Sequence, residues 1–198
     1  MSMLKPLVTL ALLSTLAGCA STQGPMDYSA FKKSNPKSIL VLPPTNHTTE
    51  VIAPYGVLAN VTVPLAEAGY YVFPVALVDE TFKNNGLTVA EDIHNVSSNK
   101  LSEIFGADAV MYIEVQEYGT SYNVLTSDTV VEVKAKLTDS KTNEILWQGS
   151  ARAASSEQDN GSSGGIVGML VEAAVTQIME TVMDTGFEIA GIASERLL

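Results

Sequence analysis

The chain has 198 residues, in which acidic side chains outnumber basic ones by 22 to 11 and give a formal net charge of −11 at pH 7. That length fits one domain with a sizeable hydrophobic core. The acidic excess repels phosphate backbones and anionic lipid surfaces, and no stripe of Lys or Arg offsets it. We therefore expect no nucleic-acid partner and no electrostatic adhesion to lipid.

The first predicted element is a secretion signal over residues 1–18. Lys5 provides a short positive region, and Leu7–Thr15 provides an apolar segment. This segment is too short for a membrane span, which needs about 20 residues. The pattern therefore indicates an export signal that is removed from the mature chain.

The residues that follow, Leu16-Ala17-Gly18-Cys19, resemble the lipobox of bacterial lipoproteins. The resemblance implies cleavage between Gly18 and Cys19 and a diacylglyceryl group, with acyl chains such as palmitate, on the Cys19 thiol. Cys19 is the only cysteine of the chain, so no disulfide competes for it. An ordinary cleavage site with a chance cysteine is the alternative. The acyl chains on Cys19 are expected to insert into a bilayer, so the predicted partners of the protein include a membrane, bound through the N-terminal lipid.

The next segment is predicted to be a flexible tether. Residues 20–27 are small, polar or Pro/Gly residues without an apolar period. By resemblance to the sorting rules of Gram-negative lipoproteins, Ala20 in place of aspartate implies the outer membrane. We assign residues 19–35 to the lipidated tether and residues 36–198 to a single periplasmic α/β domain, and we leave open whether it is exposed at the cell surface.

The first half of this domain is predicted to be a parallel βαβαβ unit. Three short runs rich in β-branched and aromatic residues have the near-continuous apolarity of strands covered on both faces: Ser38–Pro43, Tyr70–Val75 and Ala109–Val115. The segments between them have helical periodicity: Tyr55–Ala68, Val75–Lys83 and Val89–Phe105. Pro64 predicts a kink or a break in the first helix, and Gly69 predicts its end. The resulting units are expected to be right-handed.

The second half is predicted to be an antiparallel meander with one wet face. From Thr129 onward the period becomes two, which places one set of residues toward the core: Val131, Val133, Ala135 and Leu137. Asp139–Glu144 is the predicted turn. In the return strand the same alternation places Ile145, Trp147, Gly149, Ala151 and Ala153 on one face and Leu146, Gln148, Ser150 and Arg152 on the other. The reversal that leads into the meander is expected within Tyr118–Asp128.

The end of the chain is predicted to hold a mobile loop and a long helix. Residues 155–165 are polar and rich in Gly and Ser, and Ile166–Asp184 has one narrow polar line on an otherwise apolar helix. Its acidic residues count against a membrane span. We expect the sheet to bury this helix, with a homodimer through residues 166–184 as a hypothesis. Apolar residues of the tail are expected to dock on the body: Ile189, Ile192 and Leu197.

Three segments beside the lipobox resemble a family of outer-membrane lipoproteins of unknown function that includes a genome-derived vaccine antigen: Leu65–Pro74, Ile104–Asp108 and Tyr118–Tyr122. The resemblance spans almost the whole mature chain. More loosely, the hairpin over residues 137–149 is similar to one in the curli-secretion (CsgG-type) lipoprotein, in the lipoprotein activator of penicillin-binding proteins (LpoB-type) and in the amino-terminal domain of TolB. Those relatives imply an α/β sandwich that binds periplasmic proteins, and none of them implies catalysis.

Candidate chemistry elsewhere is weak, and we expect no enzyme, cofactor or metal. His47 and His94 are the only histidines, and no spacing with acidic residues indicates converging metal ligands. Gly161–Gly168 precedes a helix but lacks the Lys-Ser/Thr of a phosphate-binding loop, so a hinge is favoured. Six tyrosines are expected mainly in the core or at sheet edges, with recognition as the alternative: Tyr55, Tyr70, Tyr71, Tyr112, Tyr118 and Tyr122.

The leading hypothesis is a non-catalytic, periplasm-facing outer-membrane lipoprotein that serves as a scaffold or auxiliary subunit of an envelope assembly, export or transport system. Its expected partners are other envelope proteins or lipoproteins. The main alternative is a binding protein for a small envelope ligand, either a lipid or a peptidoglycan fragment, held beside the carboxyl ends of the parallel strands. A third hypothesis, a cell-wall hydrolase, requires paired carboxylates or a metal centre in one cleft.

Overall fold

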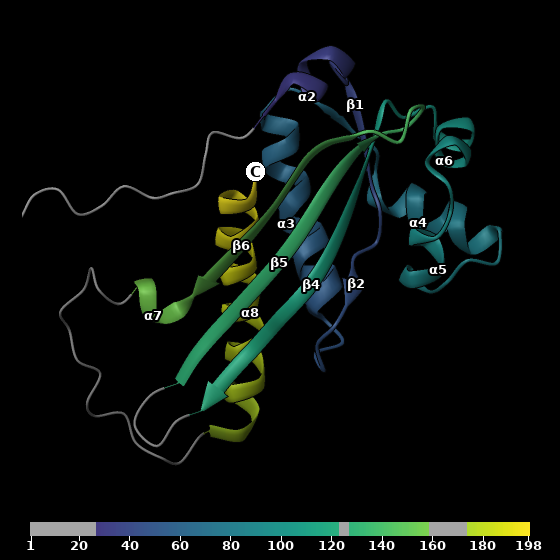
Figure 1. The fold of residues 1–198 in the computed structure, drawn as a ribbon. Coiled ribbons are helices and arrows are strands. Elements are labelled where there is room, and N and C mark those ends of the chain that lie inside the picture. Colours follow the sequence, from purple (N-terminus) through teal and green to yellow (C-terminus); the bar gives the residue numbers. More distant parts are fainter. Residues whose placement is uncertain (1–26, 123–126, 159–173) are drawn as a thin grey trace, which may run out of the picture.

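The computed structural model describes residues 27–122, 127–158 and 174–198, which form a mixed α/β fold. Its sheet has the strand order β3-β1-β4-β5-β6, and the short β2 pairs with β4 beyond the end of β1. In Figure 1, α3 and α8 run behind the three long strands, while α4, α5 and α6 gather at the right. The mixed parallel and antiparallel sheet confirms the predicted fold class. The predicted signal over residues 1–18 and the predicted lipidation site at Cys19 lie outside the described residues.

The parallel half follows the predicted order of elements. The strands are β1 (Ser38–Val41), β2 (Thr45–Asn46), β3 (Tyr71–Val72) and β4 (Ala109–Tyr122), and β1 pairs in parallel with both β3 and β4. The helices are α3 (Ala53–Glu67), α4 (Val75–Asn84), α5 (Ala90–His94) and α6 (Ser98–Phe105). A further helix, α2 (Ser29–Ser34), lies in the segment assigned to the tether, and its Phe31 packs against the core.

Pro64 does not break α3, which continues to Glu67. Pro64 lies in the last turn of the helix, so it removes one bond, the one to the Asn60 carbonyl oxygen, and only three residues of the helix follow it. Its own carbonyl oxygen accepts from the backbone N–H of Ala68 at 2.9 Å, so the helix closes normally. Gly69 then takes a left-handed conformation with φ of +91°, which confirms it as the position where the helix ends.

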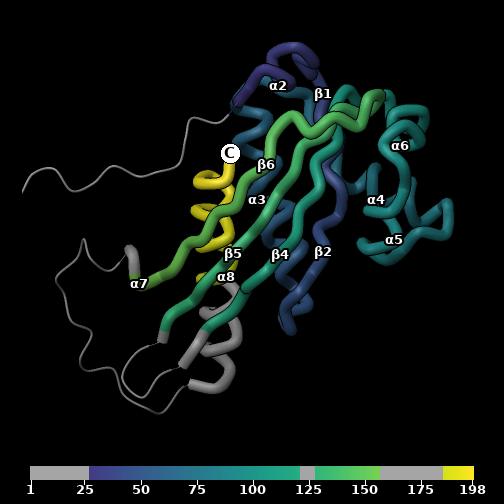
Figure 2. The backbone as a smooth tube through the Cα atoms, in the orientation of Figure 1, coloured from purple at the N-terminus to yellow at the C-terminus, as the bar shows by residue number. Residues whose placement is uncertain are grey.

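The antiparallel half consists of β4, β5 (Ser127–Asp139) and β6 (Ile145–Ala154). Figure 2 shows the three strands side by side, and the β4–β5 register runs from Ala109↔Asp139 to Tyr122↔Ser127. The predicted turn between β5 and β6 is confirmed, with Asp139 Oδ1 accepting from the backbone N–H groups of Lys141 and Thr142. The predicted reversal falls between Tyr122 and Ser127, at residues outside the described part of the chain.

The predicted facing of the first residues of β6 is wrong. Leu146, expected on the wet face, is 2% exposed, whereas Ile145, expected in the core, is 50% exposed. The cause is a register shift in the β5–β6 ladder: Leu137 pairs with Trp147, but the next residue, Thr138, pairs with Ile145. Leu146 is therefore the extra residue of a bulge, and a bulge interrupts strict alternation. The predicted core face of β5 is confirmed by the burial of Val131, Val133, Ala135 and Leu137.

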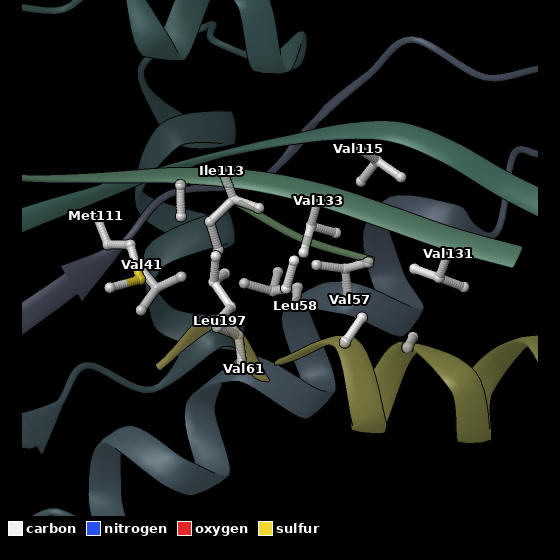
Figure 3. Close-up of a cluster of buried hydrophobic side chains, with 14 of the residues drawn as sticks. Val41, Val57, Leu58, Val61, Met111, Ile113, Val115, Val131, Val133 and Leu197 are labelled. Atoms are coloured by element: carbon white, nitrogen blue, oxygen red, sulfur yellow. The ribbon is translucent and has the colours of Figure 1, made fainter. Parts of the chain in front are cut away.

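Two hydrophobic clusters lie on opposite faces of the sheet. One joins α3, α8 and the sheet, and Figure 3 shows residues of its centre: Val41, Val57, Leu58, Val61, Met111, Ile113, Val115, Val131, Val133 and Leu197. The other joins the parallel strands to α4, α5 and α6 through Leu40, Leu42, Val78, Phe82, Ile93, Leu101 and Val110. Burial on both faces confirms the interpretation as covered parallel strands for the runs at Ser38–Pro43 and Ala109–Val115. It is wrong for the run at Tyr70–Val75, which forms only the two-residue edge strand β3, with Tyr71 59% exposed.

The last helix, α8, spans Ala174–Leu197, so the predicted end at Asp184 is wrong. The helix continues through Gly186, where Tyr118 packs against the backbone and leaves no room for a side chain. A Cβ at Gly186 would lie 2.9 Å from Tyr118 Cε1. The predicted docking of the tail is confirmed, since Ile189 and Leu197 are buried and Ile192 packs on the same core cluster. Residues 159–173, which include the predicted hinge Gly161–Gly168 and the start of the predicted helix, lie outside the described residues.

The Tyr118 ring also limits the size of a residue in α3. A Cβ at Gly56 would lie 3.0 Å from the Tyr118 hydroxyl oxygen but 3.6 Å from the nearest ring carbon. We predict that Gly56→Ala destabilises the fold by about 1–2 kcal/mol, because overpacking outweighs the higher helix propensity of alanine. In a Tyr118→Phe background, without the hydroxyl, the same change should become neutral or stabilise by up to about 1 kcal/mol. Urea unfolding of the four proteins measures this.

Gly186→Ala provides the matched control for this double-mutant cycle. A Cβ at Gly186 meets ring carbons of Tyr118 as well as the hydroxyl, at 2.9 Å and 3.1 Å from Cε1 and Cζ. Removal of the hydroxyl therefore leaves this clash in place, and Gly186→Ala should be destabilising in both backgrounds. An equal loss of stability for Gly56→Ala in both backgrounds would show that the Tyr118 hydroxyl does not limit how closely α3 approaches the Tyr118 ring.

Candidate functional site

The three long strands carry a polar face that the helices leave partly uncovered. Two rows of side chains cross β4, β5 and β6 on this face, as the strand register dictates: Tyr112–Lys136–Gln148 and Glu114–Lys134–Ser150. Lys134, Lys136, Gln148 and Ser150 are all exposed. The predicted wet face of the meander is thereby confirmed.

An open groove of about 910 Å³ lies over these rows. Its floor is formed by the two rows, and its walls come from His94 at the end of α5, from Ser97–Asn99 at the start of α6, and from Asn143 in the β5–β6 turn. Asn143 has a φ of +59°, which an asparagine tolerates in a tight turn. The groove therefore exists because α5 and α6 cover the parallel strands but end before β5 and β6.

The two lysines of the groove form no ion pair among the described residues. The Lys136 Nζ atom lies 5.0 Å from the centre of the Tyr112 ring, a cation–π distance. The Lys134 Nζ atom donates to Gln116 Oε1 at 3.5 Å, and Gln116 donates in turn to Glu114 Oε2 at 3.1 Å. The ion pairs of the described chain join other residues: Lys83 with Asp79, Lys100 with Glu103 and Arg152 with Glu117. Two cations in this groove thus remain available to an anionic group.

His94 has a structural role at one end of the groove. Its Nε2 donates to the backbone carbonyl oxygen of Pro43 at 2.9 Å, and its ring stands at 89° to the Tyr112 ring with centroids 5.4 Å apart. Burial lowers the pKa of His94 below its ordinary value of 6.5, and the positive charge of Lys136 acts in the same direction. The hydrogen bond to Pro43 and the charges of Glu114 and Glu91 oppose this lowering of the pKa.

The lowered pKa of His94 predicts a pH dependence of folding. Between the lowered folded pKa and the ordinary value of 6.5, the unfolded chain binds more protons at this site than the folded chain does. The contribution of neutral His94 is thus fully present above pH 6.5 and is lost as the pH falls through this window. From about pH 7.5 to about pH 5.5, we expect the urea midpoint of the wild type to fall more than that of His94→Gln. Equal falls in both proteins would refute the assignment.

The structure does not bring the two histidines together. His47 is exposed beside β2, while His94 lies at the groove. Within the described parts of the chain, no group of three or more His, Cys, Asp or Glu side chains is placed to hold a metal ion. Gly18 and Cys19, the predicted cleavage and lipidation residues, lie outside those parts. Of the tyrosines, Tyr118 is buried, Tyr112 lines the groove, and Tyr55 and Tyr71 are exposed.

The sequence predicted the polar strand face but not the groove above it. Alternation identifies Lys134 and Lys136 as outward-facing, yet nothing local to these strands indicates that residues 94–99 form a wall opposite them. The single helical segment predicted over Val89–Phe105 is wrong, because α5 ends at His94 and α6 begins at Ser98. The Ser97 hydroxyl caps α6 by accepting from the backbone N–H of Lys100 at 3.4 Å, and a serine that can cap a helix is the signal that was available. None of the helices within the described residues is long and apolar enough to cross a membrane.

The mixed sheet with helices on both faces defines an α/β protein, and the segment Leu16–Cys19 predicts that it is a lipoprotein. The chain belongs to the GNA1162-like family, whose model, described as "Putative lipoprotein GNA1162-like", matches residues 26–198. This membership confirms the resemblance found in the sequence and supports a membrane-anchored protein of the cell envelope.

A lipoprotein sequence and a crystal structure from Neisseria meningitidis agree with this assignment. The chain is 50% identical over 197 residues to "Putative lipoprotein NMB1124/NMB1162" of Neisseria meningitidis serogroup B. The aligned region covers 98% of this chain and 91% of that protein. The crystal structure of lipoprotein GNA1162 from Neisseria meningitidis is 54% identical with a TM-score of 0.59, over 73% of this chain and 99% of that chain. The LpoB C-terminal domain from Salmonella enterica is matched at 20% identity and a TM-score of 0.42, over 62% of this chain and 90% of that domain.

Proposed function

We propose that the protein is a periplasm-facing lipoprotein, anchored in the outer membrane through Cys19, that acts as a non-catalytic scaffold or auxiliary subunit of an envelope assembly, export or transport system. The family supports the lipid anchor. The lipobox and Ala20 support the anchoring residue and the outer membrane. In this proposal the folded domain binds other envelope proteins while the lipid keeps it at the membrane.

The observation that carries the scaffold role is the outer edge of β6. Within the described sheet β6 is the terminal strand and pairs with β5 alone. It is ten residues long, and side chains such as Gln148 and Ser150 are exposed along it. Part of the strand is covered, because α2 contacts β6 and the Arg196 side chain donates to the Arg152 carbonyl oxygen at 2.8 Å. A long edge strand is a template to which a partner protein can add a strand.

Site-specific crosslinking in living cells tests this role. A photo-crosslinking residue at Gln148, beside the edge, should yield a defined adduct with another envelope protein. The same residue at Glu67, which is exposed at the end of α3 on another part of the surface, should not. No protein adduct from Gln148 in cells that express the chain, or the same adducts from both positions, would remove the support for a scaffold that binds through β6.

The groove favours a second candidate function, the binding of a small envelope ligand. A lipid fits this role poorly, because the interface between the sheet and α3 and α8 is filled: Val57, Val61, Ile113, Val133 and Ile189 are all 0% exposed. The groove itself is lined mostly by polar side chains. A hydrophilic ligand is therefore the version of this candidate that the structure supports.

A further inference from the structure

We propose that the groove over β4, β5 and β6 binds a carboxylated sugar, of the class of the carboxylated amino sugars of the cell wall, with Lys134 and Lys136 holding the carboxylate. The choice of a cell-wall sugar rests on the proposed periplasmic location of the protein. The site itself rests on the groove and its side chains.

The two lysines are placed to share one carboxylate. They are two residues apart on β5 and face the same side, so their side chains leave the strand about 7 Å apart. Flexible lysine side chains can close that separation and donate to both oxygens of one anion. Lys136 is positioned by its place over the Tyr112 ring, and Lys134 by its hydrogen bond to Gln116.

The charge of the groove differs from that of the protein. The chain carries a formal net charge of −11, yet the charged side chains that line the groove are Lys134, Lys136 and one carboxylate, Glu114. Glu114 pairs directly across from Lys134 in the strand register, but its carboxylate accepts from Gln116 and forms no ion pair with Lys134. The groove is therefore locally cationic, which favours an anion there over the acidic remainder of the surface.

The remaining lining fits a ligand rich in hydroxyl and amide groups. Gln148 and Ser150 flank the lysines on β6, and Asn99, Asn143 and Ser97 approach from the walls. Asn, Gln and Ser side chains both donate and accept hydrogen bonds, as the hydroxyl and acetamido groups of a sugar require. A peptide is less suited, because strand addition needs a sheet edge and a bound helix needs an apolar groove, whereas this site lies on a polar sheet face.

The size of the groove agrees with such a ligand. Its volume of about 910 Å³ lies within the range of about 300–1,000 Å³ that is usual for ligand sites. The groove is open, and its polar groups are hydrated when no ligand is bound. Hydrogen bonds to a ligand therefore replace hydrogen bonds to water, and the net gain in binding free energy is small. We therefore expect a dissociation constant on the order of 1 mM for a single sugar.

The test compares two sugars that differ by the carboxylate. The lipidated full-length protein, purified in a neutral detergent, is titrated with N-acetylmuramic acid and with N-acetylglucosamine, which lacks the lactyl carboxylate. N-acetylmuramic acid should bind at least about tenfold more tightly, and Lys134→Gln/Lys136→Gln should weaken its binding by about tenfold. The matched control is Lys32→Gln/Lys33→Gln, which removes the same charge from exposed residues of α2 and should change the affinity less than about twofold.

Four outcomes would overturn the proposal. Equal binding of the two sugars, or equal loss in both double variants, would remove the role of the lysine pair. Binding of inorganic phosphate as tight as that of N-acetylmuramic acid would define a general oxyanion site, and tighter binding of triglutamate would define a peptide site. The titration uses purified protein and tests the groove alone. A negative titration therefore does not affect the scaffold role, which crosslinking tests, or the location, which fractionation tests.

Discussion

Replacement of Cys19 by serine is expected to transfer the protein from the membrane fraction to the soluble periplasmic fraction. Each methylene of an acyl chain that is buried in the bilayer contributes about 0.8 kcal/mol, so several chains hold a protein durably. The described residues contain no helix that could span the membrane in their place. Fractionation with immunoblotting measures the transfer, and metabolic labelling with a palmitate analogue should label the wild type but not Cys19→Ser.

Ala20→Asp is the control that separates anchoring from sorting. This variant keeps Cys19 and should keep both the lipid and the membrane association, but it should move from the outer to the inner membrane in a density gradient. If Cys19→Ser remained in the membrane fraction after a wash with high salt, a second anchor would be required. If Ala20→Asp stayed in the outer membrane, the residue after Cys19 would not direct sorting in this protein.

The architecture was predictable from the sequence because it depends on local periodicity. Near-continuous apolar runs at Ser38–Pro43 and Ala109–Val115 indicated strands covered on both faces, and Leu40 and Ile39 of β1 do enter the two opposite core clusters. The change of period at Thr129 indicated the antiparallel strands. These patterns require no knowledge of which distant residues meet.

Contacts between distant segments could not be predicted in the same way. The Asp108 carboxylate accepts from the backbone N–H groups of Lys37 and Ser38, 71 and 70 residues earlier, at 3.0 and 3.1 Å. These bonds tie the start of β1 to the start of β4 and hold the pKa of Asp108 below its ordinary value, the bond from Lys37 being the largest cause. No spacing pattern in the chain connects these positions.

The groove also depends on contacts between segments that are distant in the sequence. Alternation on β5 exposes Lys134 and Lys136, but the site arises because residues 94–99 stop short of β5 and β6. Where a helix stops relative to a strand depends on the packing of α4, α5 and α6 through Phe82, Ile93 and Leu101. That packing involves three separate segments, so a single-sequence pattern indicates which residues are exposed but not which exposed residues face each other.

The bulge at Leu146 leads to the second prediction with a large expected effect. Leu146→Ala should reduce the free energy of unfolding by about 2–4 kcal/mol, because it deletes a side chain that is 2% exposed in the core cluster shared with α8. Ile145→Ala removes a similar volume from a side chain that is 50% exposed, and it should cost about 1 kcal/mol or less. Urea unfolding of both variants, with the slope compared to that of the wild type, measures the difference.

The comparison of these two variants decides between two registers of the same strand. With strict alternation from Trp147 backward, Ile145 would lie in the core and Leu146 in solvent, and the order of the two costs would be reversed. The observed pairing of Leu137 with Trp147 and of Thr138 with Ile145 requires Leu146 to cost more. A larger loss for Ile145→Ala would therefore contradict the bulge. Since β6 is also the edge proposed to bind a partner, its register determines which side chains, Gln148 and Ser150 among them, are presented beside that edge.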